Sequence, residues 1–128
     1  MSPILFDTDV LIDHLRGEIQ ARDFLKKLKK KHTFVISVIT VAEIEAGIYE
    51  TERETVQEFL SFFEFSPITE AIAKKAGAYK RTFHRTHRLL LPDALIAATS
   101  FIMKMPLYTL NLKDYLMKDI TVFSPYLK

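Results

Sequence analysis

The chain has 128 residues, 48% of them hydrophobic, and a net charge at pH 7 of only +2. This length predicts one domain over residues 1–128 with a core of its own, because domains usually contain about 100–150 residues. The absence of cysteine excludes disulfides and thiolate metal sites, which fits a reducing compartment such as the cytoplasm. We expect neither a signal peptide nor a membrane span, because Asp7 follows the first apolar run without a basic segment, and Pro92 and Asp93 interrupt the longest one.

Short apolar runs alternate along the chain with longer stretches of helical period. The predicted strands are residues 4–6, 33–37, 63–65, 107–110 and 121–123. The first predicted helix is capped by Thr8 or Asp9 and ends near Gly17, and the last begins at Pro92 and covers residues 92–103. Between them, helices are predicted over residues 19–31, 40–49, 52–63 and 69–87. This alternation predicts an α/β fold with a mostly parallel sheet of about five strands.

The charges are grouped along the chain. Residues 26–31 and 80–88 are rich in lysine and arginine, whereas residues 50–58 are rich in glutamate. Such runs are typical of solvated helix faces. They also fit a second interpretation, a basic track for a polyanion beside an acidic pocket, since lysine and arginine provide the backbone affinity of nucleic-acid binders.

Acidic and amide side chains fall where predicted strands end or helices begin. Asp7 directly follows the first strand, and Asn111 directly follows the fourth. Glu43 lies in the first turns of the helix after the second strand, and Asp93 in the first turn of the helix that Pro92 opens. Because ligands bind beyond the carboxyl ends of parallel strands, these side chains should meet at one edge. Each acid also has a structural explanation, since helix N-termini favour carboxylates by about 0.3–1 kcal/mol.

Glu43 differs from its neighbour Glu45 in the direction that the helical period gives it. Val41, Ile44 and Ile48 form the apolar stripe of this helix, and Glu43 borders that stripe. Glu45 points about 200° away from Glu43, on the solvent side. The pattern therefore predicts that Glu43 reaches a pocket and that Glu45 does not.

Four segments, in order and spacing, resemble the signature segments of PIN-domain nucleases, and most closely those of the VapC-type toxins of toxin–antitoxin pairs. These segments are "ILFDTDVLIDHLRG", "ISVITVAEIEAGI", "LPDALIAAT" and "LYTLNLKDY". The resemblance covers nearly the whole chain. It implies a three-layer α/β/α fold and an endoribonuclease that depends on Mg²⁺ or Mn²⁺. It also implies RNA as the substrate, a homodimer, and a cognate VapB-type antitoxin that holds the enzyme inactive.

Residue by residue, the resemblance assigns a catalytic metal site to Asp7, Glu43 and Asp93. Thr8 matches the small hydroxyl residue that follows the first acid. Asp9 departs from the family, which commonly has Asn or Ser there, and adds a charge near the site.

The fourth acidic position of the family is also different in this chain. It is often an Asp directly after the fourth strand, and here it is Asn111, so Asp114 becomes a second candidate. If residues 111–114 form a helical turn, the two side chains share a face. We expect Asn111 to lie nearer the ion, with Asp114 holding a metal-bound water or orienting Asn111. The alternative is that Asp114 caps a helix.

Elementary electrostatics supports a metal site independently of the resemblance. Carboxylates within about 4–6 Å raise one another's pKa, so a bare cluster destabilises the fold. Mg²⁺ binds oxygen ligands and needs only one or two carboxylates in addition to water and substrate phosphate. Two such ions can activate a water and stabilise the leaving oxygen of a phosphodiester, so that no protein nucleophile is required.

A second enzyme class shares part of the first motif. Asp7-Thr8-Asp9-Val10-Leu11 also matches the motif of haloacid-dehalogenase-type phosphatases, with Asp7 as the nucleophile and Asp9 as a general acid. Ser37, after the second strand, resembles that family's second motif. However, "NLKDY" does not provide the late acidic pair that this chemistry requires.

A third possibility is a non-catalytic PIN module that binds RNA or protein and in which the acids persist as a degenerate site. His84 and His87 are three residues apart and could in principle hold a transition metal. Because no acidic partner lies beside them, a surface or RNA-facing role is the better interpretation of this pair.

Overall fold

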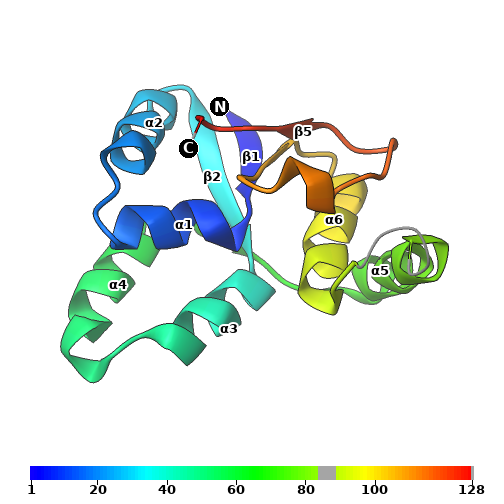
Figure 1. The fold of residues 1–128 in the computed structure, drawn as a ribbon, viewed down its shortest axis with the longest axis horizontal. Coiled ribbons are helices and arrows are strands. Elements are labelled where there is room, and N and C mark those ends of the chain that lie inside the picture. The colour runs from blue at the N-terminus through cyan, green and yellow to red at the C-terminus, as the bar shows by residue number, and fades with distance from the viewer. Residues whose placement is uncertain (84–88, 128) are drawn as a thin grey trace.

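The computed structural model describes residues 1–83 and 89–127 of the chain (Figure 1). His84, His87 and the arginines at 85 and 88 lie outside the described residues. The strands are β1 (Ser2–Phe6), β2 (His32–Ser37), β3 (Glu64–Ser66), β4 (Leu107–Tyr108) and β5 (Val122–Phe123). The α-helices are α1 (Thr8–Leu15), α2 (Ile19–Lys29), α3 (Val38–Gly47), α4 (Arg53–Leu60), α5 (Glu70–Phe83) and α6 (Leu91–Met103), with short 3₁₀ turns η1 (Glu50–Glu52) and η2 (Leu112–Asp114).

The strands form one sheet in the order β3-β2-β1-β4-β5. All four strand pairs in the described part of the chain are parallel, so the predicted mostly parallel sheet is confirmed. In the register, Leu5 of β1 lies beside Leu107 of β4, and Ile4 lies beside Phe34 of β2. β1 and β4 are adjacent although about a hundred residues separate them, and this adjacency brings the segments after both strands together.

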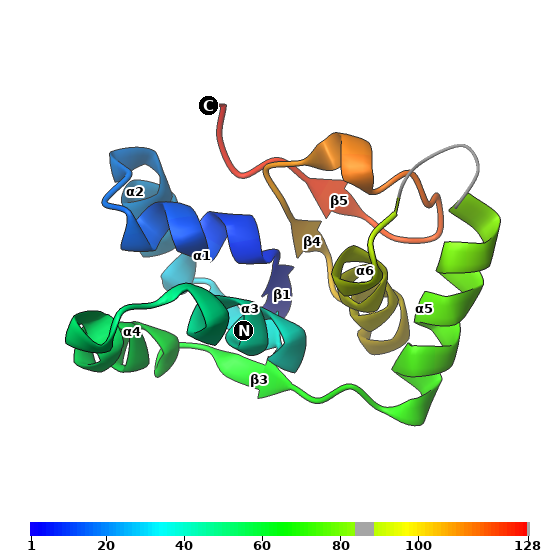
Figure 2. The same cartoon turned by 60° about the horizontal axis from the view of Figure 1, so that its bottom comes forward.

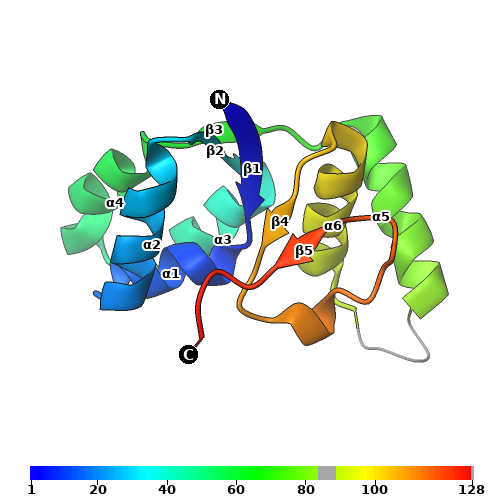
Figure 3. The same cartoon turned by 90° about the horizontal axis from the view of Figure 1, so that it is seen from above.

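Alternating side chains of the central strands enter two different cores. Ile4 and Phe6 of β1 belong to a cluster with residues of α1 to α4, whereas Leu5 belongs to a cluster with α5 and α6. Figures 2 and 3 show the two groups of helices on opposite sides of the sheet. This is the three-layer α/β/α architecture, and the predicted fold class is confirmed. No helix in residues 1–83 and 89–127 is long and apolar enough to cross a membrane.

The starts of two helices near the sheet edge differ from the prediction. Asp7, and not Thr8 or Asp9, is the N-cap of α1, because its side chain accepts a hydrogen bond from the Thr8 amide. The prediction that α3 begins at Thr40 is also wrong. Ser37 caps this helix by accepting from the Ile39 amide, so it begins at Val38 in spite of three β-branched residues in its first turn.

Other element bounds were predicted less accurately. Of the expected helix over residues 52–63, only Arg53–Leu60 form a helix, α4, and Glu52 is the last residue of the 3₁₀ turn η1. Helix α5 ends its described part at Phe83, and the remainder of the predicted helix lies outside the described residues. α6 begins at Leu91, with Pro92 as its second residue, where the missing amide hydrogen costs no helical hydrogen bond.

Candidate metal-binding active site

The carboxylate of Asp7 lies at the junction of β1 and α1, beside the end of β4. Its backbone amide donates to the carbonyl of Tyr108 at 2.9 Å, which continues the β1–β4 ladder by one residue. The residue is 7% exposed. The pairing of β1 with β4 therefore fixes the backbone position of Asp7 independently of its side-chain contacts.

Three donors hold the Asp7 side chain. Oδ1 accepts from the Thr8 amide at 2.7 Å, while Oδ2 accepts from the Thr109 hydroxyl at 2.8 Å and from the Tyr115 hydroxyl at 2.7 Å. Burial raises the pKa of Asp7, the three hydrogen bonds oppose this, and the charge of Glu43 adds to it. Sequence reasoning missed both hydroxyl donors. The signal that could have found Thr109 is its place directly after β4 between apolar residues, and Tyr115 ends the quoted segment "NLKDY".

Glu43 projects from the second turn of α3 toward the start of α1. Its Oε1 accepts a hydrogen bond from the Thr8 hydroxyl at 2.6 Å, and the hydroxyls of Thr8 and Thr40 lie 2.9 Å apart. In contrast, Glu45 forms an ion pair with Arg53, with the closest atoms 3.1 Å apart. Glu43 thus contacts a residue that follows β1, whereas Glu45 pairs with Arg53, in line with the directions that the helical period predicts for the two side chains.

Asp93 lies in the first turn of α6 and is partly buried. Burial raises the pKa of this acid to about 6, and the charges of Asp7, Asp114 and Glu43 contribute in that order, while a hydrogen bond with Tyr115 opposes the rise. The structure thus brings four of the five predicted site residues within electrostatic reach of one another.

Asn111, the fifth predicted site residue, is linked to Asp9 instead. Its side-chain amide donates to Asp9 Oδ2 at 2.7 Å, and the Leu110 amide donates to the same oxygen at 3.1 Å. The Thr109 hydroxyl lies between the two acids of the first motif, 3.3 Å from Asp9 Oδ2 and 2.8 Å from Asp7 Oδ2. Burial, followed by the charge of Asp7, raises the pKa of Asp9 to about 7.

Asp114 is the last residue of η2 and does not cap it. The N-cap of this turn is Asn111, whose side chain makes no capping hydrogen bond. Asp114 is half-buried, and its charge raises the pKa of Asp93. The two candidates for the fourth acidic position therefore lie near different residues. Asn111 contacts Asp9, and Asp114 lies close to Asp93.

The donor set at this edge fits a hard divalent cation. Its ligands would all be oxygens, which Mg²⁺ and Mn²⁺ prefer. Asp9 Oδ1 is buried without a hydrogen-bond partner, and no lysine or arginine in the described part of the chain forms an ion pair with Asp7, Asp9, Glu43 or Asp93. Residues 1–83 and 89–127 contain no preformed cluster of three acidic or histidine ligands. Mg²⁺ does not require one, because it keeps several waters.

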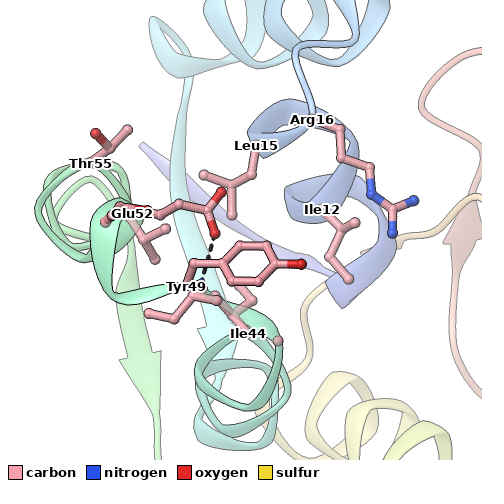
Figure 4. Close-up of a pocket in the computed structure, with 11 residues that line it drawn as sticks. Ile12, Leu15, Arg16, Ile44, Tyr49, Glu52 and Thr55 are labelled. Atoms are coloured by element: carbon pink, nitrogen blue, oxygen red, sulfur yellow. Dashed lines mark hydrogen bonds between the residues drawn. The ribbon is translucent and has the colours of Figure 1, made fainter.

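A pocket of 630 Å³ opens between α1, α3, η1 and α4 (Figure 4). Its apolar lining includes Ile12, one turn after Thr8 on α1, Ile44, which directly follows Glu43 on α3, and Val56 of α4. Arg16 and Tyr49 also line it. The lining therefore combines apolar and polar side chains, and two of its residues lie within one turn of Thr8 and Glu43 along their helices.

Ser37 does not act as the phosphatase interpretation requires. Its hydroxyl caps α3 by accepting from the Ile39 amide at 3.1 Å, and the residue is completely buried. The local geometry therefore disfavours a haloacid-dehalogenase-type site.

Comparison with known proteins gives consistent matches. The model of the PIN domain family matches residues 4–114. Ribonuclease VapC10 of Mycobacterium tuberculosis (strain H37Rv) is 45% identical over 109 residues, which cover 84% of this chain and 82% of that protein. Ribonuclease VapC19 of the same strain is 33% identical, and the match covers 87% of this chain and 90% of that protein.

Solved structures with the same fold come from several bacteria. A chain of a toxin–antitoxin complex from Klebsiella pneumoniae superposes with a TM-score of 0.82 and 31% identity, over 98% of this chain and 99% of that chain. A chain of VapBC2 from Rickettsia felis, solved with a promoter DNA fragment, superposes with a TM-score of 0.84. It is 19% identical, covering 95% of this chain and 98% of that chain, and supports the fold alone.

Proposed function

The chain belongs to the PIN domain family, and from this membership we propose that it is a metal-dependent endoribonuclease that acts as the toxin of a toxin–antitoxin pair. Two relatives that match more than 80% of the chain are named ribonucleases, at 45% and 33% identity. The 31% identical neighbour comes from a structure titled as a toxin–antitoxin complex.

The observation that carries the proposal is the electrostatic state of Asp93. Its pKa is raised to about 6 by burial and by the carboxylates of Asp7, Asp114 and Glu43, which come from three other parts of the chain. Such an arrangement lowers stability unless a cation compensates for it. A divalent cation of the kind that a metal-dependent ribonuclease binds would offset the repulsion among these carboxylates.

We assign Mg²⁺, with Mn²⁺ as an alternative, to Asp7, Glu43 and Asp93. A bound divalent cation lowers the pKa of a water ligand and stabilises the negative charge that develops on the phosphodiester. Thr8 orients the carboxylate of Glu43, and the three donors on Asp7 fix the orientation of that carboxylate. Asp114 and Asn111 complete the site, Asp114 beside Asp93 and Asn111 through Asp9.

The test is cleavage of a labelled RNA by the purified chain in Mg²⁺, in Mn²⁺ and in excess EDTA. Asp93→Asn keeps the shape of the side chain and removes its charge, and it should lower the cleavage rate about 100-fold or more, because metal catalysis contributes several kcal/mol. Asp23→Asn is the control, since Asp23 is exposed on α2 and far along the chain from the site.

Two outcomes would contradict the assignment. Equal cleavage in EDTA would exclude a required metal, and equal cleavage by Asp93→Asn would indicate a contaminating nuclease. RNA binding without cleavage by the wild-type chain would instead favour the non-catalytic PIN module.

We propose that the partner is a VapB-type antitoxin that docks in the pocket between α1, α3 and α4. Ile12, Leu15 and Ile44 in its lining favour a protein segment over RNA, and Ile44 directly follows Glu43 on α3 (Figure 4). We expect the antitoxin to place an arginine or lysine among the carboxylates, where a guanidinium can bind a carboxylate through two hydrogen bonds. The complex should therefore persist in EDTA.

Copurification with the product of the neighbouring gene tests the toxin role. Ile12→Arg would place a charge in the lining of the pocket, at a partly buried position, and should abolish the complex, whereas the exposed Asp23→Asn should leave it intact. A failure of any neighbouring product to bind, with and without Mg²⁺, would contradict the toxin role and leave the nuclease assignment standing.

We also propose a homodimer that forms next to the site. Leu90 and Leu91, at the start of α6, are 52% and 54% exposed, close in sequence to Asp93. Sedimentation equilibrium should give twice the mass of the chain, and Leu91→Lys should shift it toward the monomer. A monomeric wild-type chain at micromolar concentration would contradict the dimer.

A further inference from the structure

The two carboxylate oxygens of Asp7 accept different numbers of hydrogen bonds. An ionised carboxylate offers about four lone-pair positions, two on each oxygen. Oδ2 accepts from the hydroxyls of Thr109 and Tyr115, at 2.8 and 2.7 Å, so both of its positions are occupied. Among the described residues, Oδ1 accepts only from the Thr8 amide, at 2.7 Å. One position therefore remains, and it lies on Oδ1.

We propose that Tyr115 is a positioning residue that restricts Asp7 to binding the metal through one oxygen, and that it thereby selects Mg²⁺ over Ca²⁺. The inference rests on the proposed metal site and adds to it a residue that the acidic motif does not contain. The hydroxyl of Tyr115 does not itself bind the ion. It acts through the carboxylate to which it donates.

Tyr115 is better suited to this role than the other donor on Oδ2. The Thr109 hydroxyl is shared, since it also lies 3.3 Å from Asp9 Oδ2 and accepts from the Asn111 amide at 3.0 Å. The Tyr115 hydroxyl donates to Asp7 Oδ2 at 2.7 Å and also interacts with Asp93, so both of its acidic partners are proposed metal ligands. Its ring is 5% exposed and packs in the core formed with α5 and α6, which fixes the direction of the hydroxyl.

The preferred coordination geometries of Mg²⁺ and Ca²⁺ explain why binding through one oxygen of Asp7 would favour Mg²⁺. Mg²⁺ requires a nearly octahedral shell at about 2.0–2.1 Å, which suits a carboxylate that binds through one oxygen. Ca²⁺ accepts 6–8 oxygens in flexible geometry and readily takes both oxygens of one carboxylate. A donor that keeps Oδ2 occupied therefore disfavours the Ca²⁺ arrangement and preorganises the Mg²⁺ arrangement.

Calorimetric titration of the metal-free chain with Mg²⁺, Mn²⁺ and Ca²⁺ tests the proposal without an activity assay. Tyr115→Phe removes the hydroxyl and keeps the ring. We expect it to weaken Mg²⁺ binding about 10- to 100-fold, the usual effect of removing a hydrogen-bond partner of a metal ligand, and to change Ca²⁺ binding much less. The ratio of the Ca²⁺ to the Mg²⁺ dissociation constant should fall accordingly.

Tyr79→Phe is a matched control. The Tyr79 hydroxyl also donates to an aspartate, Asp119, at 2.7 Å, and its ring is 4% exposed in the same core. This variant loses an equivalent hydrogen bond away from the acidic edge, so it should lower the melting temperature without changing the metal affinities. It separates a loss of stability from a loss of selectivity.

The outcomes distinguish this proposal from the proposed function. If the wild-type chain binds none of the three cations, the metal site itself is wrong. If the wild-type chain binds Mg²⁺ and Tyr115→Phe keeps the same ratio of dissociation constants, Tyr115 is only a structural donor and the proposal is overturned. If Tyr79→Phe changes the ratio equally, the effect is general destabilisation, which also overturns it.

Discussion

The hydroxyl of Thr8 donates a 2.6 Å hydrogen bond to Glu43, and so ties the first turn of α1 to the second turn of α3. Thr8 is 6% exposed, whereas Glu43 is an exposed residue whose long side chain has several rotamers. The buried hydroxyl therefore selects one orientation of an otherwise mobile carboxylate.

We predict that Thr8→Val slows RNA cleavage about tenfold, because a hydrogen bond to a charged group contributes about 1.5–3 kcal/mol. The fold should persist, since the two side chains have the same shape. Single-turnover cleavage and thermal unfolding measure the two effects. Thr99→Val is the control for the loss of a buried hydroxyl, because Thr99 donates within α6 to the Leu95 carbonyl. Equal slowing in both variants would contradict a specific role for Thr8.

The metal-free chain should lose stability as the pH rises from 5 to 8. The pKa of Asp9 increases from 3.8 to about 7 on folding, so over this interval the folded chain binds more protons than the unfolded chain. The stabilisation that protonated Asp9 gives is complete below pH 4 and is lost as the pH passes 7. We expect the melting temperature in EDTA to fall by about 3 °C or more, and Mg²⁺ at pH 8 to restore it.

Asp9→Asn provides the control for this pH dependence. The variant lacks the titrating carboxyl and should show a smaller fall between pH 5 and 8. A melting temperature that rises over this interval in the wild-type chain would contradict the raised pKa of Asp9.

Exchanging the side chains of Asp9 and Asn111 tests the contact between them. Asn111→Asp places a second carboxylate where an amide donates to Asp9 at 2.7 Å, so we predict a melting temperature several degrees lower at pH 8. The double variant with Asp9→Asn restores one donor and one acceptor and should recover most of the loss. No recovery in the double variant would mean that the two side chains do not interact.

Asp114 should affect the metal requirement and not the stability. Its charge reaches Asp93, and η2 has no side-chain cap, so we predict that Asp114→Asn raises the Mg²⁺ concentration for half-maximal cleavage several-fold at an unchanged melting temperature. Lys113→Gln, in the same turn, is the control for surface charge. A lower melting temperature with an unchanged Mg²⁺ dependence would show instead that Asp114 is a structural residue.

The α/β fold could be predicted because apolar runs and helical periods alternate clearly, but the bounds of several elements could not. β1 begins at Ser2 and not at Ile4, since the parallel register pairs Ser2 and Pro3 with His32 and Thr33. β4 ends at Tyr108, two residues before the predicted end. Thr109 lies past that end, although its amide still donates to the Phe123 carbonyl at 3.0 Å, and its hydroxyl contacts the carboxylates of the first motif. Pairing between distant segments, which no local pattern contains, determines these limits.

In the candidate site, likewise, the acids could be predicted from the sequence but their contacts could not. The acids were identified from their motifs and from their places at strand ends and helix starts. Tyr115 was not, because a tyrosine among apolar residues is typical of a core, and its contact with Asp7 spans 108 residues. The pairing of Asn111 with Asp9 also depends on β4 lying next to β1, which the sequence does not state.

The position of β4 in the sheet has a consequence for synthesis of the protein on the ribosome. β4 fills the place beside β1, but it is translated about a hundred residues later, together with the donors that orient Asp7. Until then β1 has one open edge and Asp7 lacks two of its hydrogen bonds. Because chains fold progressively from the N-terminus during translation, the nascent chain cannot complete the site before its last third emerges. A complete set of contacts on Asp7 is therefore found only in chains whose synthesis is nearly finished.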